Sequence, residues 1–186
     1  MTRTTMERRE LRFALTGFGP GAHDFVLVAA TERGVAWADI DADERSLRGR
    51  FLAWSEKRYP GAAAREVVPA DDPVLAAAIA RLGNPADARE VPLDESGTEL
   101  QLLVWRALRA IHAGSRSSYA EIARSVGRPR AARAVANACA ANHIAILIPC
   151  HRAVRSDGGL GGFRWGIPRK RALLELEAAL SPTRPL

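Results

Sequence analysis

Three short apolar segments, separated by glycine-containing turns, form the first pattern along the chain. Residues 11–15, 25–30 and 34–40 are rich in apolar and β-prone side chains, and the turns between them fall at 18–21 and 32–34. Segments of this length and composition are typical of β-strands. The pattern therefore predicts a meander of three strands.

Two segments of helical periodicity follow the meander. Apolar side chains recur on one face of a predicted helix over 47–59, which a Pro-Gly pair ends. A second helix is predicted over 73–82, because Asp72 can cap it and Pro73 is favoured in a first helical turn. We interpret the polar segment 83–92, which follows, as a linker between two domains.

The second half of the chain is dominated by helical patterns. Thr98 and Ser118 each begin a capping box, in which a hydroxyl residue is followed three positions later by Gln or Glu. Gly127 separates two short helical segments, which is the outline of a helix-turn-helix. Four helices are predicted in this half, at residues 98–111, 118–126, 129–140 and 168–180.

The candidate chemistry follows an apolar run. Residues 144–148 are all apolar and mostly branched, and Pro149, Cys150 and His151 come directly after them. The run predicts a short buried strand, and Pro149 ends its pairing because proline has no amide hydrogen. Cys150 would then stand where a strand breaks into a turn, a common place for a reactive side chain. Most free cysteines are simply small buried hydrophobes, so position alone leaves both interpretations open.

Composition narrows the class of protein. The 186 residues are 47% hydrophobic, which suffices for one domain or two small ones, and no apolar run approaches the length of about 18 residues that a membrane span needs. The amino-terminal ten residues are polar and charged, unlike a secretory signal. Two cysteines make no disulfide framework, and no Cys/His cluster has zinc spacing. We therefore expect a reducing intracellular setting and no bound metal.

The net charge of +6 is unevenly distributed. Residues 1–93 hold 13 basic and 14 acidic side chains, whereas residues 94–186 hold 14 basic and 7 acidic side chains. The first half thus carries −1 and the second +7. A charge excess is usually a solvated face, but an excess confined to the half with the helix-turn-helix pattern favours a polyanionic partner.

Several short motifs occur together in the second half. They are Ser118-Tyr119, Arg133-Ala134-Val135, Asn142, Pro149-Cys150-His151-Arg152, Gly162-Phe163-Arg164-Trp165-Gly166 and Arg169-Lys170. In this order they resemble the active site of the O6-alkylguanine-DNA alkyltransferases, the methylated-DNA–protein-cysteine methyltransferases. The resemblance is dense from about residue 98 to 177 and thinner from 11 to 93, and it is greatest to the carboxy-terminal half of the Ada-type members.

The resemblance implies an α/β (α+β) fold of two domains. Residues 1–93 would form a ribonuclease-H-like scaffold domain with its linker. Residues 94–186 would form a mostly helical, winged-helix-like domain that binds DNA and accepts the alkyl group.

The resemblance also assigns catalytic roles. Cys150 would be the alkyl acceptor, activated by His151 through a water, while Glu177 would hold the far ring nitrogen of His151. Asn142 would brace the recognition helix against the active-site turn, and Tyr119 would crowd the target phosphate and donate a hydrogen bond to the guanine. Without the resemblance, we would interpret Glu177 as a solvated helix residue, Tyr119 as a core aromatic and Asn142 as a helix end or loop.

Further residues match DNA-contacting positions. The predicted helix 129–140 consists mostly of alanine, and such small side chains favour close docking in a minor groove over base readout. Arg133 matches the arginine that fills the space of a flipped nucleotide, although alone it would be interpreted as a phosphate contact or a solvated residue. Arg128 and Ser156 match contacts to the DNA backbone.

Ala153, Phe163 and Arg164 match the alkylguanine pocket. Phe163 replaces the usual tyrosine, so stacking should survive while any phenol hydrogen bond is lost. Ala153 replaces the usual valine, which slightly enlarges the pocket.

We therefore expect direct-reversal DNA repair, with one transfer per molecule, from O6-alkylguanine (and O4-alkylthymine as a further candidate) in double-stranded DNA to Cys150. No cofactor is expected, and the protein should be a monomer in the bacterial cytoplasm that acts at the nucleoid. Two alternatives are a cysteine hydrolase using Cys150 and His151, and a helix-turn-helix regulator in which Cys150 is inert. The sequence leaves open the preferred alkyl size, the regulation of expression and whether the chain is part of a longer protein.

Overall fold

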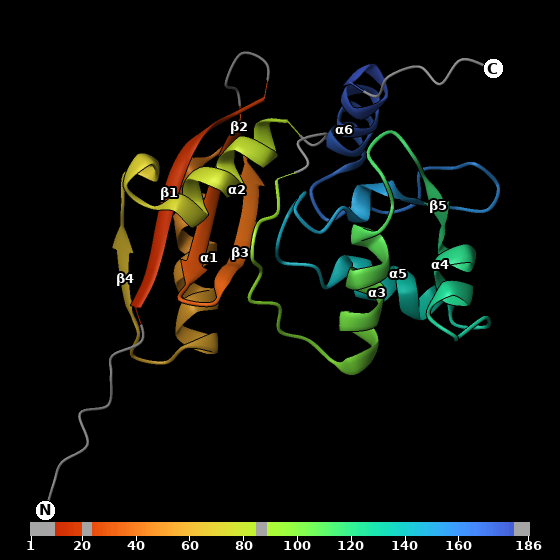
Figure 1. Ribbon diagram of the computed structural model, residues 1–186, viewed down its shortest axis with the longest axis horizontal. Helices are drawn as coiled ribbons and strands as arrows, with labels where there is room; N and C mark the ends of the chain where they lie inside the picture. The colour runs from red at the N-terminus through yellow and green to blue at the C-terminus, as the bar shows by residue number, and fades with distance from the viewer. Residues whose placement is uncertain (1–9, 20–23, 85–88, 181–186) are drawn as a thin grey trace, which may run out of the picture. The chain divides into compact units, whose positions relative to one another are not determined.

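The computed structural model describes residues 10–19, 24–84 and 89–180, and the statements below refer to these ranges (Figure 1). The chain divides into two compact units, one of residues 1–79 and 91–94 and the other of residues 80–90 and 95–186. The predicted α/β class is confirmed. The predicted domain limits, 1–93 and 94–186, stay a prediction; part of the expected linker, residues 85–88, lies outside the described ranges.

A four-stranded sheet forms the first unit. Strands β1 (Glu10–Phe18), β2 (Asp24–Thr31) and β3 (Gly34–Asp41) make the predicted antiparallel meander. A fourth strand, β4 (Ala63–Glu66), pairs in parallel with β1, which gives the order β3-β2-β1-β4. The sequence analysis missed β4 because all four of its side chains are exposed and it has no apolar alternation.

The helices of the first part of the chain begin at capping carboxylates. Helix α1 (Glu44–Arg58) starts three residues earlier than predicted, because the Asp43 side chain accepts the amides of Arg45 and Ser46. It packs on β2 and β3 and buries Leu47 and Phe51 in the core of the sheet. A 3₁₀ helix, η1 (Pro69–Asp71), precedes helix α2 (Pro73–Gly83), which Asp72 caps as predicted.

Four helices and a two-stranded sheet build the second unit (Figure 1). Helices α3 (Glu99–Arg109) and α4 (Tyr119–Ser125) begin at the two predicted capping boxes, and both pack on helix α5 (Ala132–Ala140). Strands β5 (Ser117–Ser118) and β6 (Ala153–Val154) pair in parallel. The 3₁₀ helix η2 (Cys150–Arg152) comes directly before β6, and helix α6 (Ile167–Leu180) packs against η2.

Helix α5 begins later than predicted. The sequence analysis started this helix at Pro129, but Arg128–Ala131 form a turn closed by the Ala131 amide on the Arg128 carbonyl at 2.8 Å. Proline is tolerated in the turn as well as in a first helical turn, so its position alone did not fix the boundary. Arg133 therefore lies in the first turn of α5, not in the middle of a helix.

The apolar segment 144–148 is not a strand. It forms consecutive tight turns, with the Leu147 amide on the Ala145 carbonyl at 2.7 Å and the Ile148 amide on the Ile144 carbonyl at 3.2 Å. Ile146 has a φ of +64°, an uncommon value for a β-branched residue. These local hydrogen bonds satisfy backbone groups that would otherwise pair with a neighbouring strand. The apolar run can therefore be buried without forming a strand.

None of the helices in the described ranges combines the length and the apolar character needed to cross a membrane.

Candidate active site

Cys150 is positioned by the buried turn that precedes it. The Cys150 amide donates to the Ile148 carbonyl at 2.8 Å, and Cys150 is the first residue of η2. Its side chain is only 3% exposed. The thiol therefore sits on a tight backbone bend between α5 and α6.

Asn142 holds this bend from behind. Its side chain is fully buried and all of its hydrogen bonds go to the active-site segment. The carbonyl oxygen Oδ1 accepts the Ile144 amide at 2.9 Å, and Nδ2 donates to the Ile148 carbonyl at 2.9 Å and to Cys150 Sγ at 3.3 Å. Asn142 follows α5 by two residues, so its hydrogen bonds connect the end of that helix to the thiol.

A buried network joins η2 to α6. His151 Nε2 lies 2.8 Å from Glu177 Oε1, and both side chains are fully buried. Arg152 donates through Nε to both carboxylate oxygens of Glu177 at 3.1 Å, and through Nη2 to Oε1 at 2.8 Å. The Gly114 amide donates to Oε2 at 3.2 Å, and Arg152 Nη1 donates to the Ile111 carbonyl. Arg152 belongs to the Pro-Cys-His-Arg motif, but nothing in the sequence around it indicates this role.

The network fixes the charge states of its members. Burial alone would raise the pKa of Glu177, but the hydrogen bonds from His151 and Arg152 outweigh it and lower the pKa to about 2. Burial lowers the pKa of His151, and the positive charges of Arg152 and Lys170 act in the same direction, against the hydrogen bond and charge of Glu177. The imidazole is therefore neutral at neutral pH, and its Nδ1 atom is buried without a hydrogen-bond partner among the described residues.

Burial also controls the thiol. It raises the pKa of Cys150 to about 11, although the hydrogen bond from Asn142 and the charge of Lys170 act in the opposite direction. The resting site thus contains a protonated thiol, a neutral imidazole and an ionised carboxylate. This combination suits a thiol that loses its proton to a base when it reacts.

Cys150 opens on a pocket of about 520 Å³. Phe163 and Arg164, two of the three predicted pocket residues, line it; the third, Ala153, is fully buried in β6 and does not line it. The full lining consists of Tyr119, Ala136, Cys139, Ala140, Cys150, Arg155, Gly161, Gly162, Phe163 and Arg164.

Tyr119, the first residue of α4, forms one wall of the pocket. Its hydroxyl donates to the Gly162 carbonyl at 3.4 Å, and burial raises its pKa to about 12, so the phenol keeps its proton. Gly161 lies against it with a φ of +68°, and a Cβ there would come within 2.8 Å of the Tyr119 hydroxyl. Only glycine fits this close approach.

Lys170 stabilises the backbone that Tyr119 contacts. This fully buried side chain on α6 donates to the carbonyls of Ala153 at 2.6 Å, Leu160 and Gly162 at 3.2 Å. Its ammonium also lies 5.9 Å from the centre of the Tyr119 ring. A lysine in an amphipathic helix is usually solvated, so no local pattern indicates that this one is buried.

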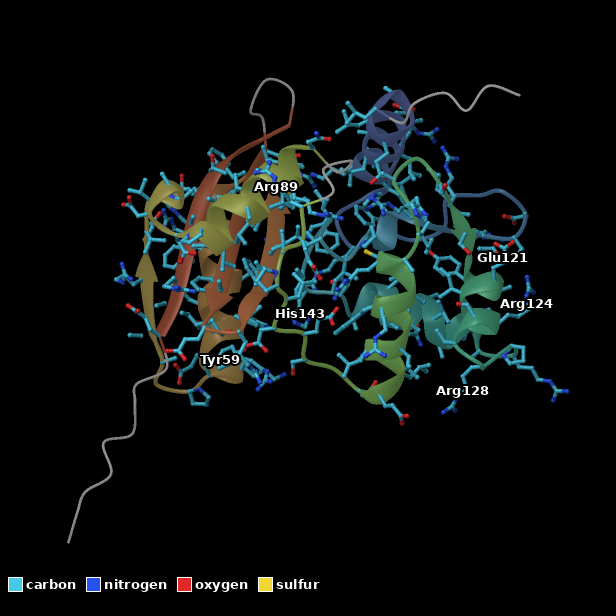
Figure 2. All side chains as sticks on the ribbon, viewed as in Figure 1. Tyr59, Arg89, Glu121, Arg124, Arg128 and His143 are labelled. Carbon is cyan, nitrogen blue, oxygen red and sulfur yellow. The ribbon has the colours of Figure 1, made fainter. Side chains whose placement is uncertain are left out.

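Three of the four predicted DNA-contacting residues, Arg128, Arg133 and Ser156, are exposed, whereas Tyr119 is half-buried. Arg128 lies in the turn before α5, Arg133 in the first turn of α5 and Ser156 in the loop after β6. Figure 2 shows Arg124 and Arg128 pointing away from α4 and the turn that follows it. Their roles toward DNA stay a prediction. No group of three or more His, Cys, Asp or Glu side chains suited to hold a metal ion occurs in the described part of the chain.

Several known proteins are similar to this chain in sequence. Residues 99–179 match the family model described as 6-O-methylguanine DNA methyltransferase, DNA binding domain. The bifunctional transcriptional activator/DNA repair enzyme Ada of Escherichia coli is 41% identical over 175 residues, which are 92% of this chain and 47% of Ada. The inducible methylated-DNA–protein-cysteine methyltransferase of Bacillus subtilis is 34% identical over 83% of this chain and 84% of its own length.

A solved structure agrees along nearly the whole chain. The crystal structure of Mycobacterium tuberculosis OGT in complex with DNA has a TM-score of 0.70 and 31% identity, and covers 92% of this chain and 96% of its own. The chain spans about half the length of several curated relatives that it matches, Ada among them. From the identity and coverage of these relatives, the chain belongs to the methylated-DNA–protein-cysteine methyltransferase family.

Proposed function

We propose that this protein repairs DNA by direct reversal, moving the alkyl group of O6-alkylguanine in duplex DNA to Cys150. The observation that carries the proposal is a buried thiol that opens on a base-sized pocket. The next residue in the chain, His151, is hydrogen-bonded to Glu177. The relatives named as methylated-DNA–protein-cysteine methyltransferases support the reaction type.

At the alkyl carbon, the reaction forms one bond to sulfur and breaks one bond to oxygen, while the thiol loses a proton and the guanine gains one. His151 Nδ1 takes the thiol proton through a bridging water, and the resulting imidazolium is stabilised by the Glu177 carboxylate at 2.8 Å from Nε2. The sulfur then forms a bond to the alkyl carbon, while the bond from that carbon to O6 breaks with its electron pair on the guanine. The guanine gains one proton in return, and Tyr119 assists by donating a hydrogen bond or a proton to it. The thioether product is stable, so each molecule acts once.

The substrate enters as a flipped nucleotide. A base inside a duplex cannot reach a thiol at the bottom of a pocket, so enzymes of this kind turn the target out of the stack. Arg133 fills the space that the nucleotide leaves, and Arg128 and Ser156 hold the DNA backbone. The small side chains of α5, most of its alanines being partly or fully exposed, fit a minor groove. The relative solved in complex with DNA supports DNA as the partner.

The thiol, its relay and the pocket all come from one chain and from one compact unit. The site is therefore complete in a monomer. No metal or cofactor enters the proposed reaction, and we place the activity in the cytoplasm, at the nucleoid, where the substrate lies. O4-alkylthymine is a further candidate substrate.

The mass of the intact protein after reaction with an O6-methylguanine duplex tests the proposal. We expect one added methyl group, located on Cys150, and product formation that stops at one equivalent. Cys150→Ala should accept none, while Cys139→Ala is the matched control and should still accept one. Methyl on Cys139, or continued turnover, would refute the proposal. Turnover of an ester or peptide would favour a cysteine hydrolase, and DNA binding without methyl transfer would favour a regulator.

A further inference from the structure

The walls of the Cys150 pocket carry charge of one sign only. Arg155 and Arg164 are its charged lining residues, and no aspartate or glutamate lines it among the residues that the structure describes. At about 520 Å³ the pocket has the size of sites that bind drug-sized ligands, so a guanine with a substituent larger than methyl can enter. Such a substituent would meet a positive electrostatic potential.

The two arginines differ in how their charge is balanced. Arg155 and Arg164 are both exposed, but Arg155 forms an ion pair with the likewise exposed Asp157 at 2.8 Å. Arg164 forms no ion pair within the described ranges: its contacts are neutral, the Asn142 carbonyl at 3.3 Å from Nη1 and the Trp165 ring, whose centre is 5.8 Å from the guanidinium carbon. The unbalanced positive charge of the pocket is therefore that of Arg164.

Arg164 also lies close to the reacting atoms. Asn142 connects Arg164 with Cys150. Its backbone carbonyl accepts a hydrogen bond from Arg164, and its side chain donates one to Cys150 Sγ at 3.3 Å. A substituent whose first carbon is in contact with the sulfur thus has its far end in the same pocket as the guanidinium. Docked DNA would shield the pocket from water, and a lower dielectric strengthens the attraction between opposite charges.

We propose that Arg164 makes this pocket selective for O6 substituents that end in a carboxylate. The proposal rests on the proposed function and names a substrate class for it, of which O6-carboxymethylguanine is the smallest member. The guanidinium fork matches the two oxygens of a carboxylate. Lys170 does not serve this purpose, because three backbone carbonyls surround its ammonium.

The reaction itself keeps the same balance of atoms. The Cys150 sulfur forms a bond to the CH₂ carbon, the bond from that carbon to O6 breaks, and its electron pair stays on guanine. The thiol loses one proton to His151 and the guanine gains one. The product is S-carboxymethylcysteine at residue 150, so the carboxylate is unchanged and remains beside Arg164.

The test compares two duplex substrates that differ in charge and scarcely in shape, O6-carboxymethylguanine and the neutral amide O6-carbamoylmethylguanine. Single-turnover rates are measured at saturating DNA, and the quantity of interest is the ratio of the acid rate to the amide rate. Intrinsic chemical reactivity cancels when ratios of variants are compared. We expect Arg164→Gln to lower the ratio about tenfold, which corresponds to roughly 1.4 kcal/mol, and Arg164→Lys to keep most of it. Arg155→Gln is the matched control and should change the ratio less than about twofold.

An unchanged ratio in Arg164→Gln, or an equal loss in Arg155→Gln, would overturn the assignment. O6-methylguanine serves as the reference substrate in every variant. If the unaltered protein transfers methyl groups but the ratio of acid rate to amide rate is the same in Arg164→Gln, only this inference fails. If it transfers no methyl group, the proposed function fails first.

Discussion

Burial keeps the Cys150 thiol protonated, so its reactivity depends on the groups that can take its proton. The thiol has a pKa of about 11 and the neighbouring imidazole is neutral, which leaves His151 free to act as a base. Glu177 has a pKa of about 2 and stays ionised throughout the neutral range. The carboxylate is therefore ready to stabilise the imidazolium at the moment it forms.

Thiol alkylation should follow this charge arrangement. Below a pKa of about 11 the thiolate fraction rises tenfold per pH unit, so the rate of Cys150 alkylation by iodoacetamide in a Cys139→Ala background should rise from pH 7 to pH 9 without a plateau.

Glu177→Gln should slow methyl transfer from duplex DNA at least about tenfold and raise the apparent thiol pKa, because the imidazolium loses its partner.

Glu175→Gln is the matched control, since Glu175 lies on the same helix but is exposed. Circular dichroism of each variant checks that the fold survives the change beside Arg152. A rate plateau below pH 8 in the unaltered protein would contradict the raised pKa of the Cys150 thiol. An unchanged apparent thiol pKa in Glu177→Gln would remove Glu177 from the mechanism.

At the scale of elements, α5 and the turn before it form the surface that we assign to DNA. The helix begins at Ala132, and Arg133 is its exposed long side chain in the first turn, among alanines. The amides of a first helical turn lack partners within the helix and attract phosphates. Because α5 begins at Ala132, Arg133 lies at a helix end that itself attracts phosphates.

Arg133 should matter for the duplex and not for the free base. Turning a nucleotide out of the stack costs a few kcal/mol, and a flat, charged guanidinium can occupy the vacated space. Arg133→Ala should slow repair of duplex O6-methylguanine at least about tenfold, a barrier of roughly 1.4 kcal/mol. Reaction with free O6-benzylguanine, which needs no flipping, should change little.

Arg130→Ala provides the comparison, because Arg130 is also exposed but lies in the turn before the helix. It should weaken DNA binding while leaving the duplex rate at saturating DNA nearly unchanged. If Arg133→Ala slows both substrates together, Arg133 supports the fold or the pocket and does not fill the space of a flipped nucleotide.

At the scale of the whole molecule, positive charge is concentrated in the second half of the chain. Residues 94–186 carry 14 basic and 7 acidic side chains, and several of these basic residues have structural partners: Arg152 pairs with Glu177, and Lys170 is enclosed by carbonyls. The arginines that remain exposed around α4, α5 and the pocket are available to phosphates.

Binding to duplex DNA should therefore be electrostatic and nearly independent of sequence. Each phosphate that is neutralised releases counterions, so the affinity should fall at least about tenfold between roughly 50 and 200 mM salt. Fluorescence anisotropy with two unmodified duplexes of different sequence measures both properties. A salt-insensitive affinity, or a strong preference for one of the two sequences, would contradict this assignment.

Local signals in the sequence determined much of this protein. The three strands, the two capping boxes and the start of α2 follow from side chains within a few positions of one another, and the structure has them where they were predicted. The motif order also led us to propose Cys150 and His151 as site residues, and these two stay together in any fold because they are adjacent in the chain.

Only the tertiary structure decided which distant groups meet. Glu177 reaches His151 across 26 positions, and Lys170 finds three carbonyls 8 to 17 positions away. The run 144–148 became turns instead of a strand because Asn142 and the run itself satisfy its backbone groups. Burial of a charge depends on partners supplied by other elements, and no local pattern encodes those partners.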